Sequence, residues 1–163
     1  MTMTSTVIKV GIADMKITEA PNKLKTSGLG SCVGVVVYNQ TLAGLAHVML
    51  PDSEASSREN QNILKYADTA IDKMVQDLLE KGARKSSLKA KIAGGAHMFS
   101  FQTESNFLKI GERNIQAVIR QLEIHQIPLV AQDVGGNKGR TIEFDIVDNQ
   151  LEIRTVRGNT TII

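Results

Sequence analysis

Two apolar runs separated by a short polar link constrain the fold of this chain more than any other feature. The runs are Val33–Tyr38 and Leu42–Val48, and Asn39-Gln40 lies between them. Stretches rich in β-branched residues that flank a turn are typical of paired strands. We therefore predict a β-hairpin in which Tyr38 lies opposite Thr41. A two-residue loop and a four-residue loop with the same centre both give this register.

The predicted register brings a cysteine and a histidine together. In an antiparallel pair the residue numbers of opposed positions have a constant sum, so Cys32 falls opposite His47. Opposed side chains share one face, with Cβ atoms about 4.5 to 5.5 Å apart. A nucleophile and its base need this proximity. A lone cysteine or histidine beside apolar residues is also typical of a protein core, and the residues alone leave that alternative open.

Composition favours a cytoplasmic protein of one domain, 1–163. The chain has a net charge of +2, no Trp and 4% aromatic residues, which argues against nucleic acid as a partner. The start of the chain lacks the pattern of a signal peptide, and no apolar run approaches the length of a membrane span. A single cysteine excludes an intrachain disulfide. His97 and His125 lack metal-ligand spacing, so we expect no metal.

The remaining pattern predicts an α+β fold with layered mixed or antiparallel sheets and two long helices. The first helix follows the capping-box spacing Ser56–Glu59 and continues to Gly82, and the second runs from Glu112 to His125. Strands are predicted at Val7–Ala13, Val33–Tyr38, Leu42–Val48, Lys89–Ala93, Leu129–Asp133, Thr141–Val147 and Leu151–Val156, the last two joined as a hairpin.

The glycines near Cys32 do not indicate a nucleotide site. Gly28, Gly30 and Gly34 have the spacing G-x-G-x-x-x-G and precede a predicted strand, whereas the dinucleotide fingerprint opens a helix. We therefore expect no cofactor. The segment from Thr26 to Ser31 is predicted to be a loop.

Five segments, in order along the chain, resemble the CheD family of chemoreceptor glutamine deamidases. The sequence departs from the family pattern at Ser27, where an apolar residue is expected, and in the tail from Leu151 onward. The segments that carry the resemblance are Thr26–Gly34, Leu45–Asp52, Gly94–Phe99, Ile110–Asn114 and Asp133–Arg140.

The resemblance implies a function and roles for three residues. Cys32 would be the nucleophile, His47 the general acid and base, and Thr26 the residue that orients the imidazole. The substrates would be glutamine side chains on the cytoplasmic helices of methyl-accepting chemoreceptors, and the phosphatase CheC would be a further partner. The fold would be similar to that of the cysteine hydrolases related to cytotoxic necrotizing factor.

The chemistry of such a reaction adds two expectations. An adjacent imidazolium would lower the pKa of the Cys32 thiol. Backbone N–H groups of Gly28, Gly30 and Ser31 would stabilise the oxyanion of the tetrahedral intermediate. Transfer of the acyl group to an amine uses the same thioester and stays open.

Other interpretations also stay open from the residues. The chain could be a non-catalytic adaptor that binds receptors or the phosphatase, with Cys32 packed in the core. Gly94-Gly95 could line a substrate cleft or form a tight turn, and the turn is the slightly favoured interpretation. Arg140, after a glycine-rich loop, could contact an acidic receptor surface or simply be solvated.

Overall fold

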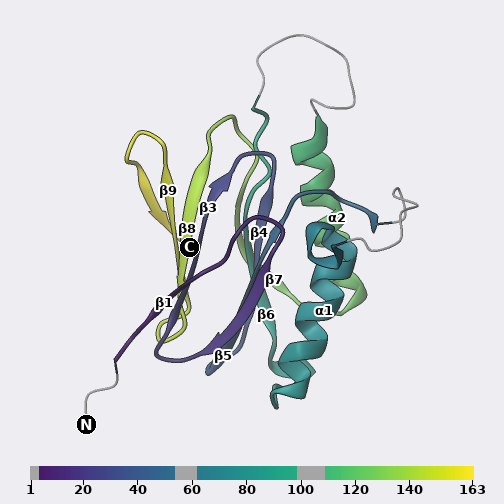
Figure 1. The fold of residues 1–163 in the computed structure, drawn as a ribbon, viewed down its shortest axis with the longest axis vertical. Coiled ribbons are helices and arrows are strands. Elements are labelled where there is room, and N and C mark those ends of the chain that lie inside the picture. Colours follow the sequence, from purple (N-terminus) through teal and green to yellow (C-terminus); the bar gives the residue numbers. More distant parts are fainter. Residues whose placement is uncertain (1–3, 54–61, 99–108) are drawn as a thin grey trace.

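The chain folds into three layers in a computed structural model that describes residues 4–53, 62–98 and 109–163. Two five-stranded sheets, called the outer and the inner sheet, pack face to face. Two helices cover the face of the inner sheet that points away from the outer sheet (Figure 1). Within the described residues neither helix has the length and apolar character that crossing a bilayer requires.

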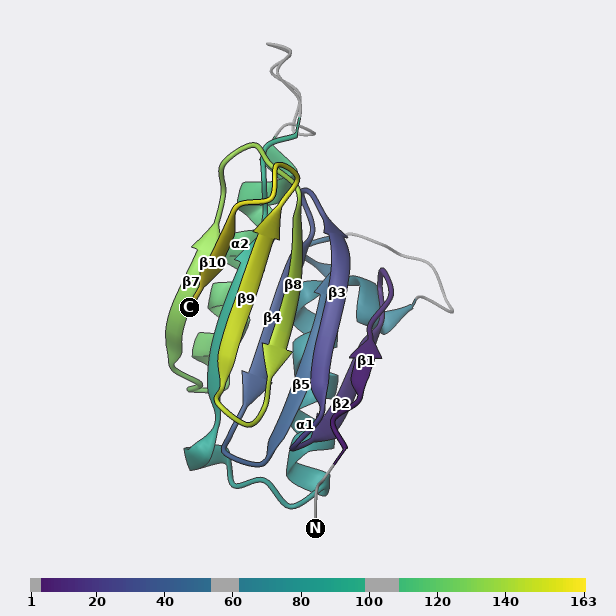
Figure 2. The ribbon, with the colours of Figure 1, turned by 90° about the vertical axis from the view of Figure 1, so that its left-hand side faces the viewer.

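The outer sheet has no helix on its exposed face (Figure 2). Its strand order is β1-β3-β8-β9-β10. β1 runs parallel to β3, and the other neighbours are antiparallel. The strands are β1 (Val7–Lys9), β3 (Lys23–Leu29), β8 (Arg140–Asp145), β9 (Gln150–Thr155) and β10 (Thr160–Ile162).

The inner sheet lies between the outer sheet and the helices, with the order β2-β5-β4-β6-β7. Its central strand β4 is buried on both faces, which explains why its sequence is continuously apolar. Val33, Val35 and Val37 contact the helix side, and Val36 and Tyr38 contact the outer sheet. The strands are β2 (Met15–Glu19), β4 (Val33–Tyr38), β5 (Leu42–Val48), β6 (Lys89–Gly94) and β7 (Leu129–Val134).

Both helices bury an apolar stripe against the inner sheet. Helix α1 (Ala67–Glu80) follows a short 3-10 turn, η2 (Ile63–Lys65), and α2 is Ile110–Ile124. A second 3-10 turn, η3 (Lys85–Ser87), precedes β6. The side chains of α1 that are buried recur at helical spacing, as the sequence predicted: Ala67, Ala70, Ile71, Met74, Val75 and Leu78.

Most of the predicted elements are confirmed, and the differences lie at their ends. The first helix begins at Ala67, and its predicted cap, Ser56–Glu59, lies outside the described residues. The predicted strand Val7–Ala13 ends at Lys9. Three strands were not predicted: β2, β3 and β10. Each of them lacks a long apolar run, because β2 and β10 are edge strands and the alternation of buried residues along β3 is interrupted at Ser27-Gly28.

The predicted register of the β4–β5 hairpin is wrong by two residues. Gly34, rather than Cys32, lies opposite His47, and Tyr38 pairs with Ala43. Residues 39–42 lie between the last pair, Tyr38 and Ala43, and the Asn39 carboxamide oxygen accepts the backbone N–H groups of both Thr41 and Leu42. This side-chain cap moves the centre of the turn by one residue.

Candidate active site at the start of strand β4

His47 is completely buried between the two sheets and has one side-chain contact to the outer sheet. Its Nδ1 lies 2.8 Å from Oγ1 of Thr26, on β3. The backbone of His47 is fixed as well, since its N–H donates to Asp14 and its carbonyl accepts from Ala13. The segment before β2 and strand β3 therefore hold the imidazole in one orientation.

The Thr26 hydroxyl determines which imidazole nitrogen carries the proton. Thr26 Oγ1 donates its only hydrogen to the carbonyl of Val10, 2.7 Å away. It can therefore only accept from His47, so Nδ1 bears the proton and Nε2 presents a lone pair. Among the described residues Nε2 has no hydrogen-bond partner. A buried imidazole with an unused lone pair is arranged to act as a base.

Cys32 lies on the same side of the inner sheet as His47. It is half-buried and packs against the core between the two sheets. Gly34, two residues later, is directly opposite His47. In the observed register Cys32 is thus a diagonal neighbour of His47, at a typical Cβ separation of roughly 7 Å. The structure thus bonds Thr26 to His47 and places Cys32 on the same side of the inner sheet, although not in the predicted opposed pair.

Burial keeps both groups uncharged at neutral pH. It lowers the pKa of the His47 imidazole below its ordinary 6.5. It also raises the pKa of the Cys32 thiol above its ordinary 9.0, and a hydrogen bond from the backbone of Cys32 offsets only part of this rise. The expected lowering of the Cys32 pKa is therefore wrong, because a buried, neutral imidazole supplies no positive charge to stabilise the thiolate.

The predicted loop Thr26–Ser31 is wrong in its first part, because Thr26–Leu29 belong to strand β3, and only Gly30 and Ser31 lie outside a strand. Thr26 and Leu29 both pair with β8, and the ladder shifts register between them at Ser27-Gly28. Leu29 is fully buried, which anchors the chain again after this bulge. Gly28 has a φ of +74°, which suits glycine at such a position.

The expected oxyanion donors are not all available. The N–H of Gly30 donates to the Gly28 carbonyl at 3.1 Å, so it is already used. Of the N–H groups expected from the sequence, Ser31 stays a candidate, together with Cys32 itself. Gly28 lies in the exposed bulge.

Gly94-Gly95 braces the backbone on the other side of the cysteine. The N–H of Gly95 donates to the carbonyl of Cys32, and the N–H of Ala96 donates to that of Gly30. A Cβ added at Gly94 would lie 2.3 Å from the Cys32 carbonyl oxygen. The two glycines have φ values of +116° and +69°. Gly94 ends strand β6 and Gly95 continues from it without a turn, so the favoured interpretation of a tight turn is wrong, and the two glycines instead pack on the backbone of Cys32.

Asn114, on α2, is a buried polar residue to which sequence reasoning gave no role of its own. Its Nδ2 donates to the carbonyls of Ser31 and Met49, each at 2.9 Å. Ser31 precedes Cys32, and Met49 follows His47 by two residues. The only sequence signal was its place at the end of the segment Ile110–Asn114, because a buried asparagine has no periodic pattern.

Arg140 is neither a surface residue nor free to contact a receptor. It is 9% exposed, its Nε lies 3.6 Å from Asp133, and its Nη2 donates to the Gly135 carbonyl. Both sequence interpretations of Arg140 are therefore wrong. Arg140 begins β8 opposite the buried Leu29, so its side chain cannot reach into solvent as a loop arginine would.

The other two histidines have structural contacts. The backbone N–H of His97 donates to Gly136. His125, at the end of α2, lies 2.6 Å from Asp72 of α1, which gives it a specific partner beyond the helix dipole. No group of three or more potential metal ligands occurs among the residues that the structure describes.

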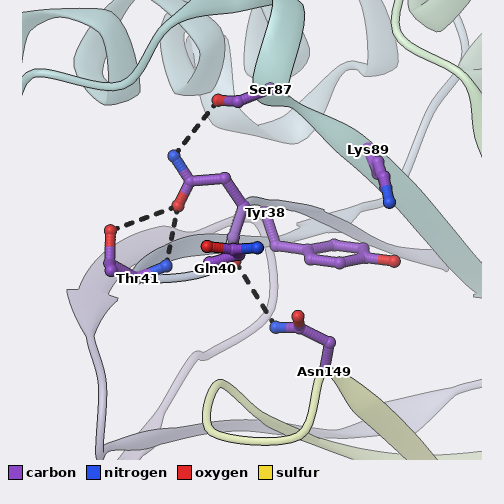
Figure 3. A pocket seen from close by; sticks show the side chains of 7 residues that line it. Tyr38, Gln40, Thr41, Ser87, Lys89 and Asn149 are labelled. Carbon is purple, nitrogen blue, oxygen red and sulfur yellow. Dashed lines mark hydrogen bonds between the residues drawn. The ribbon is translucent and has the colours of Figure 1, made fainter.

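A hollow lies at the other end of β4. It has a volume of about 440 Å³ and is lined mostly by polar residues. Figure 3 shows their side chains, several of which are hydrogen-bonded to each other. This hollow contains none of the residues that the sequence singled out for chemistry. Its lining residues are Tyr38, Asn39, Gln40, Thr41, Ser87, Lys89 and Asn149.

Comparison with known proteins relates this arrangement to one family. A sequence profile described as CheD chemotactic sensory transduction matches residues 49–155. Proteins named chemoreceptor glutamine deamidase CheD from Bacillus licheniformis and Bacillus subtilis are 52% and 51% identical to the chain. The alignments cover 98% and 99% of this chain, and 96% and 99% of the relatives. A probable chemoreceptor glutamine deamidase from Desulfitobacterium hafniense is 50% identical, over 98% of this chain and 99% of its own. The chain therefore belongs to the CheD family.

Proposed function

We propose that this protein hydrolyses the side-chain amides of glutamines on chemoreceptors and thereby takes part in chemotaxis. The names of the relatives support the reaction and the substrate. The observation that carries the proposal is the buried imidazole of His47, fixed at Nδ1 by Thr26, with a free lone pair at Nε2 on the sheet face that Cys32 shares.

The first half of the reaction forms a thioester. His47 Nε2 accepts the thiol proton as Cys32 Sγ attacks the carboxamide carbon of the glutamine. The C–N bond then breaks, and the imidazolium returns the proton to the leaving nitrogen, which departs as ammonia. Because thiol and imidazole are both neutral at rest, proton transfer accompanies attack instead of preceding it. Catalytic hydrogen bonds commonly close only when substrate binds, which accounts for the unpartnered Nε2.

The second half of the reaction restores the enzyme. Water attacks the thioester carbon, gives a proton to His47, and the C–S bond breaks to leave a glutamate carboxyl group. The imidazolium returns its proton to the sulfur. We propose that the N–H groups of Ser31 and Cys32 stabilise the oxyanion in both halves, since the N–H of Gly30 is occupied.

The resemblance to the family adds two further proposals. The phosphatase CheC would be a partner, and the two-sheet fold would be related to that of the cytotoxic necrotizing factor hydrolases. The exposed residues around Cys32 support binding of a protein substrate: Met98, which covers Gly30, is 46% exposed.

Mass spectrometry of a receptor cytoplasmic fragment tests the proposal directly. The wild-type protein should convert specific glutamines to glutamates, whereas Cys32→Ala and His47→Ala should convert none. Binding of the fragment without any change in its glutamines would favour the adaptor function instead. Attachment of an added amine to the same glutamines would indicate acyl transfer.

A further inference from the structure

The strongest unassigned feature of the molecule is the side chain of Asn114. It is fully buried, and its two amide hydrogens bond two carbonyls that belong to different parts of the site. One carbonyl is that of Ser31, next to the nucleophile, and the other is that of Met49, just beyond His47. One planar group thus fixes the distance between the two segments.

The orientation of the Asn114 amide is unambiguous. Both of its partners are carbonyl oxygens, which can only accept, so the nitrogen must face them. Its Oδ1 is buried without a hydrogen-bond partner among the described residues. A buried acceptor without a partner is unfavourable, and such groups in native proteins call for an explanation. The explanation here is that the two hydrogen bonds from Nδ2 fix the amide in an orientation that leaves Oδ1 unpaired.

The surroundings of Asn114 show that α2 is held close to the site. A Cβ added at Gly111 would lie 2.6 Å from the carbonyl oxygens of Gly95 and Ala96. These two residues also bond the backbone of Cys32 and Gly30. The first turn of α2 therefore packs against Gly95 and Ala96. The Asn114 side chain extends further and contacts Ser31, the residue before Cys32.

We propose that Asn114 is a positioning residue that holds Cys32 and His47 at their working separation. The inference rests on the proposed function, because it concerns the same nucleophile and base. Asn114 has no direct part in the chemistry. It acts through the backbone on either side of the pair, and a displacement of 1 Å is enough to slow a reaction by ~100-fold.

Two variants and a control on the same helix test the proposal. Asn114→Ala removes both donors, and Asn114→Ser keeps one hydroxyl donor without adding charge. The control is Gln121→Ala, because Gln121 is also buried on α2, about two turns later, and donates to Asp72 on α1. The loss of the Gln121 side chain disturbs the packing of α2 without removing a contact to Ser31 or Cys32.

We expect kcat for receptor-fragment deamidation to fall by ~100-fold in Asn114→Ala and by less in Asn114→Ser, with KM nearly unchanged. Gln121→Ala should keep the wild-type kcat at a comparable loss of Tm. Alkylation of native Cys32 by iodoacetamide should become faster in both Asn114 variants, because the released loop exposes the sulfur. Asn114→Ser serves as the test if Asn114→Ala does not fold.

The outcomes separate this inference from the proposed function. If Cys32→Ala is inactive while both Asn114 variants retain wild-type kcat, the positioning role is wrong and the deamidase function stands. If the wild type converts no glutamine, the proposed function fails. Unchanged alkylation of Cys32 in the Asn114 variants would then also show that Asn114 does not position the cysteine. Equal losses of kcat in Gln121→Ala and Asn114→Ala would reduce Asn114 to a stabilising residue.

Discussion

The two ends of strand β4 differ in how their polar atoms are satisfied. At the Tyr38 end a hollow of about 440 Å³ is lined by residues such as Asn39, whose amide bonds Ser87, Thr41 and Leu42. At the Cys32 end, His47 Nε2 and Asn114 Oδ1 are buried and have no partner within residues 4–53, 62–98 and 109–163. The buried lone pairs at the Cys32 end, rather than the hollow at the Tyr38 end, therefore mark the candidate site.

The largest expected difference between the two ends is in activity itself. Cys32→Ala should lower kcat for receptor-fragment deamidation by ~1000-fold or more, because the nucleophile is lost. Lys89→Ala, which alters the hollow at the Tyr38 end, should leave kcat unchanged. Both rates can be measured from ammonia release. Equal losses in the two variants would show that the hollow belongs to the site.

The second difference concerns two threonine hydroxyls. Thr26→Val should lower kcat by about 100-fold, because His47 loses the group that fixes its tautomer. Thr41→Val, at the opposite end of the hairpin, removes an exposed hydroxyl and should have no effect on kcat. Thr26→Ser keeps the hydroxyl and should recover most of the rate. Full activity of Thr26→Val would remove Thr26 from the site.

The third difference is in the tolerance of glycines with positive φ. Gly94→Ala should lower the free energy of unfolding by about 3 kcal/mol, because strain at φ +116° adds to a contact of 2.3 Å with the Cys32 carbonyl. Gly82→Ala, where the space is open, should cost only about 1 kcal/mol. Urea unfolding measures both. Similar costs would mean that the backbone near Cys32 yields easily.

The smallest expected difference is in the pH dependence of stability. The pKa of His47 is lower in the folded protein than in the unfolded chain, so the unfolded chain binds its proton first. Stability from this group is therefore present above pH 6.5 and is lost as pH falls below it. At the Tyr38 end burial lowers the pKa of Lys91 below its ordinary 10.5. The change of stability with pH that Lys91 causes therefore falls in the alkaline range.

Urea unfolding of the wild type and of His47→Gln between about pH 5 and pH 7 tests this difference. The wild type should lose stability on acidification, and the variant should lose less, since glutamine does not titrate. Parallel slopes for the two proteins would contradict a lowered pKa of His47.

The sequence predicted the elements whose periodicity is strong. Strand β4, strand β5 and both helices follow from runs of apolar residues that face a core. Strand β3 could not be found, because its bulge at Ser27-Gly28 interrupts the alternation of buried and exposed residues. The hairpin register failed for a similarly local reason, the side-chain cap supplied by Asn39.

The candidate site was predicted in its residues more than in its geometry. Cys32 and His47 were predicted from sequence spacing and from the family resemblance, Thr26 from the resemblance alone, and their roles stay predictions. The error in register did no harm, since a shift by two residues keeps Cys32 and His47 on the same face of the sheet. The bond from Asn114 could not be foreseen, because it joins segments 65 and 83 residues apart in the chain.

The unequal exposure of the two central residues has a consequence for the order of events in the proposed reaction. His47 is completely enclosed, whereas Cys32 is half-exposed. In the part of the chain that the structure describes, the proposed reaction therefore places the glutamine side chain, the departing ammonia and the incoming water all on the side of Cys32. Because they use the same side of the site, ammonia has to leave before water can enter, and this order determines the sequence of steps. A receptor helix that stays bound over the thioester would keep water away from it and would therefore delay the hydrolysis that releases the helix.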